Sequence, residues 1–331
     1  ARQKKTYRHY GEYVDTKWCI ETEQDSPAST GAPTGQAPAC SRPEIKPGEE
    51  LPAEFGAGKN PYQWPIPLIA SNTPTKPQLR GHYDPKAADF NLQYPDQFRV
   101  DEFLREFAGF VDARKKGQGE LLPNFVLLRL PNDHTAGTRP GSPTPNASVA
   151  DNDLALGRMV EAVSESPYWE DTAILVLEDD AQNGADHVDA HRSIALVISK
   201  YAPRPQREGT VEKPYVDHHF YTTVNMIRTM ESLLGLPPMN QNDGYAAVMA
   251  PLFAGAGDQP VFTADYRNRD NGMIYQANPA TAPGAKESSQ LDFSGADRAD
   301  VAVLNQILWK AAKGNIPMPK TQHSVFPQTG D

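Results

Sequence analysis

The sequence predicts an α/β fold: a mostly parallel sheet with helices on both of its faces. Apolar runs typical of strands alternate with helical patterns between residues 124 and 235, an order typical of strands joined by helical crossovers. The runs AILV (173–176) and IALVI (194–198) are continuously apolar, which indicates strands buried on both faces. The chain shows no internal repeat, so we expect one domain overall.

The first 95 residues differ from the rest in composition. They are rich in Pro, Gly, Ser and Thr and show little apolar periodicity, which predicts a loop-rich segment ahead of the α/β part at residues 96–331. Both cysteines, Cys19 and Cys40, lie in this segment. Because a polar, Pro-rich segment gains most from a cross-link, we expect a disulfide between them, with two free thiols as the alternative. A disulfide would indicate an oxidising compartment.

Periodicity defines the other elements. Asp217 is expected to cap the helix at 217–235, the third of four expected helices, and Gly235 to end it in the left-handed conformation. The second helix is expected to face inward with Val149, Leu156, Val160 and Val163. The expected helices cover 98–116, 149–165, 217–235 and 299–314, and the expected strands cover 124–130, 172–179 and 193–200.

Composition excludes several classes of function. The 331 residues carry a net charge of −10 with no basic stripe to offset it, which argues against a nucleic-acid partner. No run of about 18 apolar residues occurs, so we expect no membrane span. No apolar stretch follows the basic start ARQKKTYRHY, so we expect no signal peptide within this sequence and a mature or truncated product.

Acidic residues and histidines gather where the expected strands end. LEDDAQNGADHVDAHRS (177–193) places five acidic residues and two histidines between two apolar runs, and PNDHT (131–135) follows the preceding strand. Ligands gather beyond the carboxyl ends of strands in open α/β sheets, and carboxylates with imidazoles are common ligands of divalent cations. The pattern therefore predicts a metal site, with a solvated loop as the alternative. A third cluster, Asp217, His218 and His219, opens the helix expected at 217.

Motifs of other enzyme classes are missing. The sequence contains no Walker loop, dinucleotide fingerprint, G-x-S-x-G elbow or HExxH. Glu178 and Asp179 alternate along the expected strand and should point to opposite faces, which leaves Glu178 in a supporting role.

Four segments also resemble a known family. RLPNDHTAGT (129–138), the stretch from ADNDLALGRM to DAHRS (150–193), VDHHFYTTVNMIRTMESLLGLPPM (216–239) and LNQILWKAAKG (304–314) are similar to bacterial phosphoesterases of the phospholipase C/acid phosphatase type, in the alkaline phosphatase superfamily. The resemblance runs from about Tyr7 to Pro319. It implies an alkaline-phosphatase-like fold and a metal-dependent hydrolase acting on a phosphate ester.

The resemblance implies a role for individual residues. Asp179 and Asp180 match the acidic pair that binds the catalytic metal, although the family commonly has Glu at the second position. His187 matches the histidine of the family's Asp-His-Val, and His134 matches its other active-site histidine; both would contact phosphoryl oxygens or the leaving group. The divalent metal could be Zn, Mn, Ca, Mg or Fe. The supporting positions are Asp133, Asp186, His191 and His218.

One part of the family's site is missing. Family members begin with a strand ending in Glu-Asn and carry a Ser or Thr nucleophile downstream, and residues 1–95 contain neither; Thr135 is the one strand-end hydroxyl near the cluster. We therefore expect the C-terminal part of a family member, incomplete in fold, with the nucleophile-bearing half on a separate chain or with homo-oligomer contacts in its place. A non-catalytic structural or assembly protein with the same fold is the alternative. We expect a periplasmic or secreted location.

Overall fold

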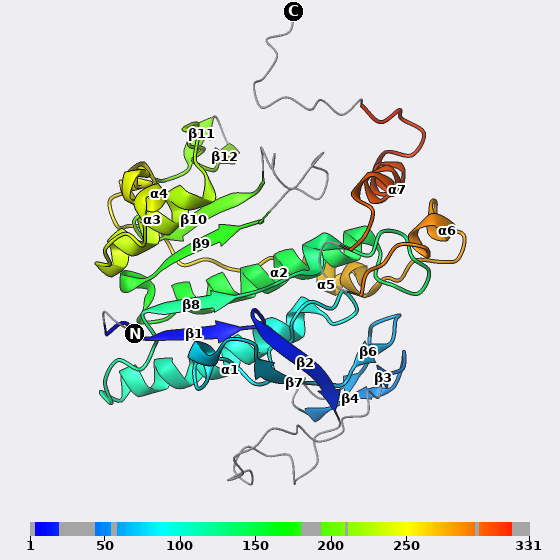
Figure 1. Ribbon diagram of the computed structural model, residues 1–331, viewed down its shortest axis with the longest axis horizontal. Coiled ribbons are helices and arrows are strands. Elements are labelled where there is room, and N and C mark those ends of the chain that lie inside the picture. Colours follow the sequence, from blue (N-terminus) through cyan, green and yellow to red (C-terminus); the bar gives the residue numbers. More distant parts are fainter. Residues whose placement is uncertain are drawn as a thin grey trace, which may run out of the picture. The chain divides into compact units, whose positions relative to one another are not determined.

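The computed structural model describes residues 4–19, 44–53, 58–179, 193–208, 211–294 and 298–319, and the account below concerns these residues. They form a mixed α/β structure with small two-stranded sheets (Figure 1). The strands are β1 (Tyr7–Tyr10), β2 (Val14–Cys19), β3 (Glu44–Ile45), β4 (Glu50–Leu51), β5 (Gly58–Lys59), β6 (Ile66–Pro67), β7 (Ile69–Pro74), β8 (Phe125–Leu128), β9 (Ala173–Leu177), β10 (Ala195–Ser199), β11 (Gln206–Glu208) and β12 (Val211–Lys213). The α-helices are α1 (Asp96–Lys115), α2 (Pro145–Ser164), α3 (Thr223–Leu234), α4 (Gln241–Tyr245), α5 (Arg267–Asp270), α6 (Ala285–Ser288) and α7 (Val301–Lys313).

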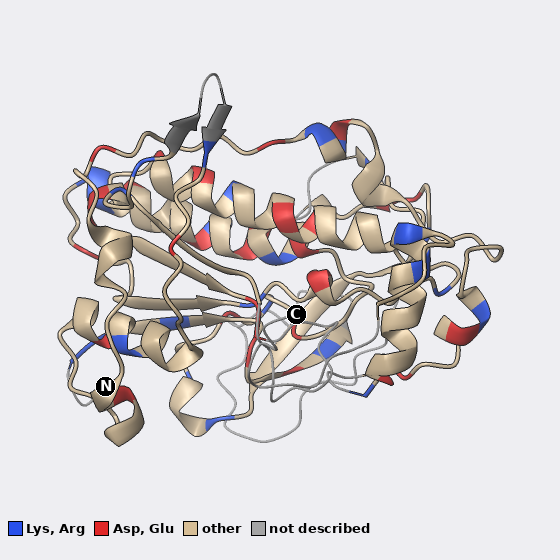
Figure 2. Cartoon of the chain, turned by 90° about the horizontal axis from the view of Figure 1, so that it is seen from above, with Lys and Arg blue, Asp and Glu red and all other residues tan. Residues whose placement is uncertain are grey.

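The chain divides into two compact units. The first unit takes the described residues of 1–7, 107–125 and 159–264, and the second takes those of 8–106, 126–158 and 265–331. The two long helices, α1 and α2, each begin in the second unit and end in the first. Figure 2 shows acidic and basic residues interspersed over the helices.

The predicted mostly parallel sheet is wrong for the strands around the acidic run. β9 and β10 pair antiparallel, with Ala195 opposite Leu177 and Ser199 opposite Ala173. Parallel strands need a crossover, usually a helix, and residues 178–194 contain no helical apolar pattern that could form one. The two strands are also not buried on both faces, because Leu177 and Leu196 remain 40% and 42% exposed.

The parallel arrangement is found in β1 and β8. The carbonyl of Thr6 accepts from the amide of Phe125, and the carbonyl of Tyr10 accepts from the amide of Arg129, so the two strands run in the same direction. The pairs β11–β12, β2–β7, β3–β6 and β4–β5 are antiparallel. The carboxyl end of β8 leads directly into the PNDHT segment.

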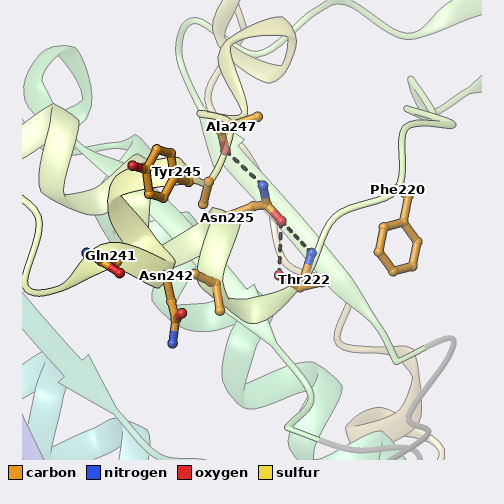
Figure 3. Close-up of a pocket in the computed structure, with 9 residues that line it drawn as sticks. Phe220, Thr222, Asn225, Gln241, Asn242, Tyr245 and Ala247 are labelled. Atoms are coloured by element: carbon orange, nitrogen blue, oxygen red, sulfur yellow. Dashed lines mark hydrogen bonds between the residues drawn. The ribbon is translucent and has the colours of Figure 1, made fainter.

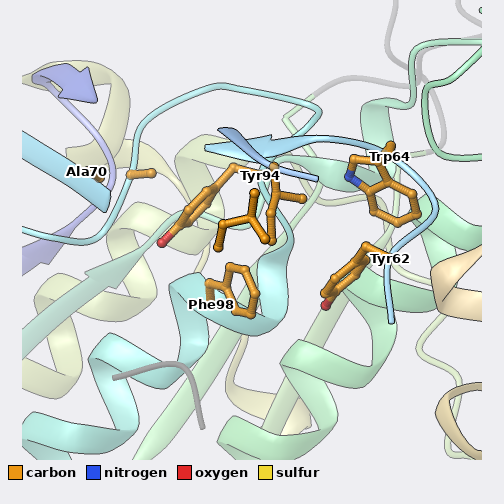
Figure 4. Packing of buried hydrophobic residues seen from close by; sticks show 8 residues of the cluster. Tyr62, Trp64, Ala70, Tyr94 and Phe98 are labelled. Carbon is orange, nitrogen blue, oxygen red and sulfur yellow. The ribbon is translucent and has the colours of Figure 1, made fainter. Parts of the chain in front are cut away.

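An aromatic cluster forms the core of the second unit (Figure 4). The Tyr62 ring meets Trp64, Phe98 and Tyr275 edge to face, at centroid distances of 4.8, 5.7 and 5.0 Å. Such pairs contribute about 0.5–1.5 kcal/mol each beyond the area they bury. The buried members of the cluster are Ile45, Tyr62, Trp64, Ile66, Ala70, Ala88, Tyr94 and Phe98. The N-terminal segment, expected to be loops, therefore contributes both short strands and core.

The long helices lie where periodicity placed them, with one inward position wrong. α2 spans Pro145–Ser164, and Val160 and Val163 are buried as expected. Val149, however, is 51% exposed, while Leu154 is buried. The helix begins four residues earlier than expected, and its first turns bury small side chains such as Ala147 in place of Val149.

The third predicted helix begins later than expected. α3 starts at Thr223, and its cap is Thr222, which forms a capping box with Asn225; Asp217 therefore does not cap it. The reciprocal hydrogen bonds of a capping box satisfy amide groups that would otherwise lack partners. Gly235 ends the helix at φ 64°, as predicted. α7 ends at Lys313 and Gly314 follows it at φ 62°.

Candidate functional site

The predicted site residues fall partly within the described structure. Asp133 and His134 lie in the second unit, and Asp179 and His218 lie in the first. The other predicted residues lie outside the described residues: Asp180, Asp186, His187 and His191. Cys40 lies outside them as well, and so does the predicted disulfide with Cys19.

The segment after β8 makes a tight turn that holds Asp133 and His134. Asn132–His134 form one turn of 3₁₀-helix, in which the His134 amide donates to the carbonyl of Pro131 at 3.2 Å. The Nδ1 atom of His134 lies 3.0 Å from the carbonyl oxygen of Thr135. Because a carbonyl only accepts, Nδ1 carries the proton, and the neutral ring is the tautomer with its lone pair on Nε2.

Thr135 has a strained backbone next to this histidine. Its φ of 60° and ψ of 159° place a β-branched residue in a region that is almost reserved for glycine. The strain is held by burial and by hydrogen bonds: the residue is 3% exposed, its amide donates to Asn132, and its hydroxyl accepts from the amide of Gly137 at 3.2 Å. Backbone strain of this kind costs about 1–3 kcal/mol and concentrates at functional sites.

Aromatic rings hold the His134 imidazole on two sides. Phe90 meets it edge to face at 5.4 Å, and Phe293 does so at 6.3 Å. Phe90 also lies under the guanidinium of Arg129, whose carbon is 5.5 Å from the ring centroid. Arg129 in turn pairs with Glu12 at 3.0 Å and with Asp89 at 2.8 Å. The imidazole therefore sits in a fixed orientation at the carboxyl end of the β1–β8 pair.

His9, on β1, is a residue that sequence analysis missed. It is 5% exposed, and neither ring nitrogen has a hydrogen-bond partner among the described residues. Burial lowers the pKa of His9, against the opposing effect of the Asp89 carboxylate. The alternation along β1 was a signal for its placement, because Arg8 and Tyr10 both bond Glu106 and His9 points the other way.

Asp179 follows β9 at the end of the β9–β10 pair where the acidic run begins. Glu178 closes the hairpin: its amide donates to the carbonyl of Ile194 at 3.0 Å, and its Oε2 accepts from the amide of Ile194 at 3.0 Å. The hydroxyl of Ser193 donates to the Glu178 carbonyl at 2.7 Å. Asp179, one residue on, is exposed. The acidic run therefore begins next to residues that hydrogen bonds hold in place.

A second interaction missed by sequence analysis joins Asp217, His219 and Tyr221. One carboxylate oxygen of Asp217 accepts from the backbone amide of His219 at 2.9 Å and lies 2.5 Å from its Nδ1, and the other accepts from the Tyr221 hydroxyl at 3.3 Å. Burial opposes ionisation, but the hydrogen bonds from His219 outweigh it and lower the pKa of Asp217. The i, i+2 spacing of Asp and His was the available signal.

Asp217 and His219 line a pocket in the first unit. Tyr215, Val216, Asp217, His218 and His219 surround a pocket of about 330 Å³. A pocket of about 630 Å³ lies beside the start of α3 (Figure 3). There Asn225 accepts from Thr222 and donates to the carbonyl of Ala247, so its amide is held by the protein.

Two properties of the described residues bear on metal and membrane binding. No three His, Cys, Asp or Glu side chains in the described ranges lie close enough together to hold one metal ion. Of the helices in the same ranges, none has both the length and the hydropathy to cross a bilayer.

Comparisons with family models, with curated proteins and with solved structures found no match for this chain.

Proposed function

We propose that the chain belongs to a metal-dependent hydrolase of phosphoric esters. The observation that carries the proposal is the acidic run after β9: the strand's last paired residue is Leu177, and Asp179 follows two positions later as an exposed carboxylate. Adjacent carboxylates repel one another unless a cation or hydrogen bonds compensate. The resemblance of DDAQNGADHV (179–188) to the metal-binding motif of phosphoesterases supports the same function.

The donor chemistry of the acidic run fits a divalent cation. Asp179 supplies carboxylate oxygens, which hard cations prefer, and the proposal adds Asp180 and His187 as the remaining ligand and phosphate contact. A bound cation would neutralise charge on the phosphoryl oxygens. Glu178 is left in a supporting role, because its Oε2 accepts from the amide of Ile194 and holds the end of β9.

In this proposal His134 contacts phosphoryl oxygens or the leaving group. Its ring contacts Phe90 and Phe293 edge to face, and the carbonyl oxygen of Thr135 near Nδ1 sets its tautomer. A fixed imidazole loses little entropy on binding substrate and can accept or donate a proton at Nε2. Thr135 itself is a poor nucleophile because its hydroxyl is buried and accepts from Gly137. The proposal therefore places the nucleophile outside this chain.

Hydrolysis of an aryl phosphate by the purified chain, together with any copurifying partner, tests this proposal. We expect metal-dependent release of the aryl alcohol, reduced at least tenfold by Asp179→Asn. Asp153→Asn is the matched control, because Asp153 is an exposed carboxylate on α2 and not part of the acidic run in the sequence. Equal activity of the two variants would refute the assignment of Asp179.

One observation favours the alternative of a non-catalytic assembly protein. Apolar side chains remain exposed at the end of the β9–β10 pair next to the acidic run: Ile194 is 59% and Leu196 is 42% exposed. Exposed apolar side chains that lie near one another mark interaction surfaces. This alternative predicts association that Leu196→Glu weakens in sedimentation experiments. Leu233→Glu, an exposed position on α3, is the control.

A further inference from the structure

Two buried carboxylates meet at the turn that holds His134. Asp96, at the start of α1, and Asp151, in the middle of α2, are 0% and 2% exposed. In the part of the chain that the structure describes, one cation forms an ion pair with them: Arg99, itself 0% exposed, pairs with Asp96 at 2.9 Å. Two buried carboxylates with one cation leave one negative charge to be compensated, and an uncompensated buried charge is costly.

Asp151 caps α1 from outside that helix. Its Oδ2 accepts from the Asp96 amide at 2.6 Å and its Oδ1 accepts from the Gln97 amide at 3.4 Å. These amides belong to the first turn of α1, where backbone N–H groups lack partners within the helix. The side-chain amide of Gln97 also donates to the Asp151 carbonyl at 2.7 Å. Asp151 thereby fixes the start of α1 against α2.

Both carboxylates also hold Asn132, the first residue of the His134 turn. The Asn132 amide donates to Asp96 at 3.0 Å, and its side-chain Nδ2 donates to Asp151 at 2.8 Å. Asn152 donates to Asp96 and to the carbonyl of Leu130, which fixes the chain two residues before the turn from the same cluster. The position of His134 therefore depends on two carboxylates that act through Asn132 and Leu130.

Arg99 connects the cluster to the other side of the imidazole. Its guanidinium donates to the carbonyls of Ala88, Asp89 and Asn91, at 3.0, 2.7 and 3.1 Å. These bonds fix the segment that carries Phe90, whose ring lies against His134. Asp96, through Arg99, thus positions the ring contact as well as the turn.

The cluster is short of a proton donor. Among the described residues nothing donates to the buried Oδ1 of Asn132, although buried amide oxygens are almost always satisfied. The cluster has one uncompensated negative charge and one unsatisfied acceptor. A bound proton would therefore stabilise it.

We infer that Asp96 and Asp151 hold one proton between them in mildly acidic solution, lose it around neutral pH, and act as positioning residues for His134. This inference deepens the proposed function, on which the role of His134 rests. Loss of the proton places two negative charges around Asn132, so the carboxylates repel one another across the residue that both hold. Burial and the Asp96 carboxylate raise the pKa of Asp151 to about 7, and burial raises the pKa of Asp96 despite Arg99. Among the described residues, the phenols of Tyr62 and Tyr275 also face Asp151, and the guanidinium of Arg158 lies 3.0 Å from the side-chain oxygen of Gln97.

The amide signals of Asp96 and Gln97 in nuclear magnetic resonance spectra test the inference, because both amides donate to Asp151. We expect them to titrate together with a midpoint near pH 7 in the wild type, and to do so still in His134→Gln, which excludes the imidazole as the source. Asp151→Asn should abolish the step. Asp101→Asn should keep it, because Asp101 pairs with Arg158 between the same two helices without touching Asn132.

Two results would overturn the inference. One is the absence of any titration of these amides between pH 5 and 9 in the wild type, which decides the matter even where Asp151→Asn fails to fold. The other is an equal loss of the step in Asp101→Asn. The pH profile of kcat/KM for aryl phosphate should follow the same midpoint. The amide signals require no turnover. A missing phosphatase activity would therefore refute the proposed function and leave the inference about the shared proton intact.

Discussion

Gly11 lies so close to the carbonyl of Ala88 that a Cβ atom on Gly11 would stand 2.8 Å from that oxygen. Gly11 follows β1 at φ 79°, and Ala88 begins the segment that carries Phe90 to His134. A side chain at this position would have to push that segment away. The approach of backbone to backbone is therefore part of how the second unit holds the imidazole.

Gly11→Ala is expected to destabilise the protein by about 1–3 kcal/mol more than Gly81→Ala. Gly81 has the same φ of 79° but nothing within 4 Å of the added Cβ, so both variants share the backbone strain and only one has the clash. The free energy of unfolding in urea measures the difference. Equal losses would show that the contact with Ala88 relaxes without cost.

Asp217→Ala should destabilise the first unit by about 1–3 kcal/mol, because it leaves the amide of His219 and the hydroxyl of Tyr221 without their acceptor. Asp265→Ala is the matched control: Asp265 accepts from the Arg267 amide at the same spacing, but its side chain is 54% exposed against 6% for Asp217. Urea unfolding compares the two. A loss as large in the control would mean that burial of Asp217 contributes nothing.

The raised pKa of Asp151 predicts a specific pH dependence of stability. The folded-state pKa of about 7 lies above the ordinary 3.8, so between these values the folded state binds more protons than the unfolded state. The contribution of Asp151 to stability is therefore greatest below pH 4 and falls as pH rises to about 7. Asp151→Asn should reduce the difference in unfolding free energy between pH 5 and pH 8 by more than about 1 kcal/mol. An unchanged difference would contradict the raised pKa.

His134→Gln should lower kcat/KM for an aryl phosphate by about 10²–10⁴-fold, the usual contribution of a positioned acid or base. His82→Gln, a half-buried histidine of the same unit, should leave it unchanged. The rate of aryl alcohol release gives both values. Full activity of His134→Gln would remove this residue from the proposed mechanism.

Local patterns predicted the elements whose cause is local. The 3.6-residue periodicity located α1 and α2 within a few residues, and Gly235 marked the end of α3 because a left-handed residue there needs glycine. Asp217 as a helix cap was wrong because Thr222 and Asn225 form a capping box closer to the helix. Asp217 and the pair Thr222 and Asn225 are all residue types that cap helices, and the sequence alone does not show which position forms the cap.

Features that depend on distant residues were not predictable in this way. Apolar runs show that strands exist but carry no direction, so the antiparallel return of β10 along β9 was missed. Burial of Arg99 depends on carbonyls at 88–94, and the capping of α1 by Asp151 joins residues 55 apart in the chain. At the candidate site, the strand-end positions of Asp133 and His134 were predicted from the end of β8, whereas the ring contacts of His134 with Phe90 and Phe293 were not.

The most direct test of the central proposal is hydrolysis of an aryl phosphate before and after removal of divalent cations from the purified chain and any copurifying partner. The proposal predicts that chelation lowers the rate more than tenfold, that one added divalent cation restores it, and that Asp179→Asn prevents the restoration. A rate that chelation leaves unchanged, or no hydrolysis with any added cation, would contradict a metal-dependent phosphoesterase.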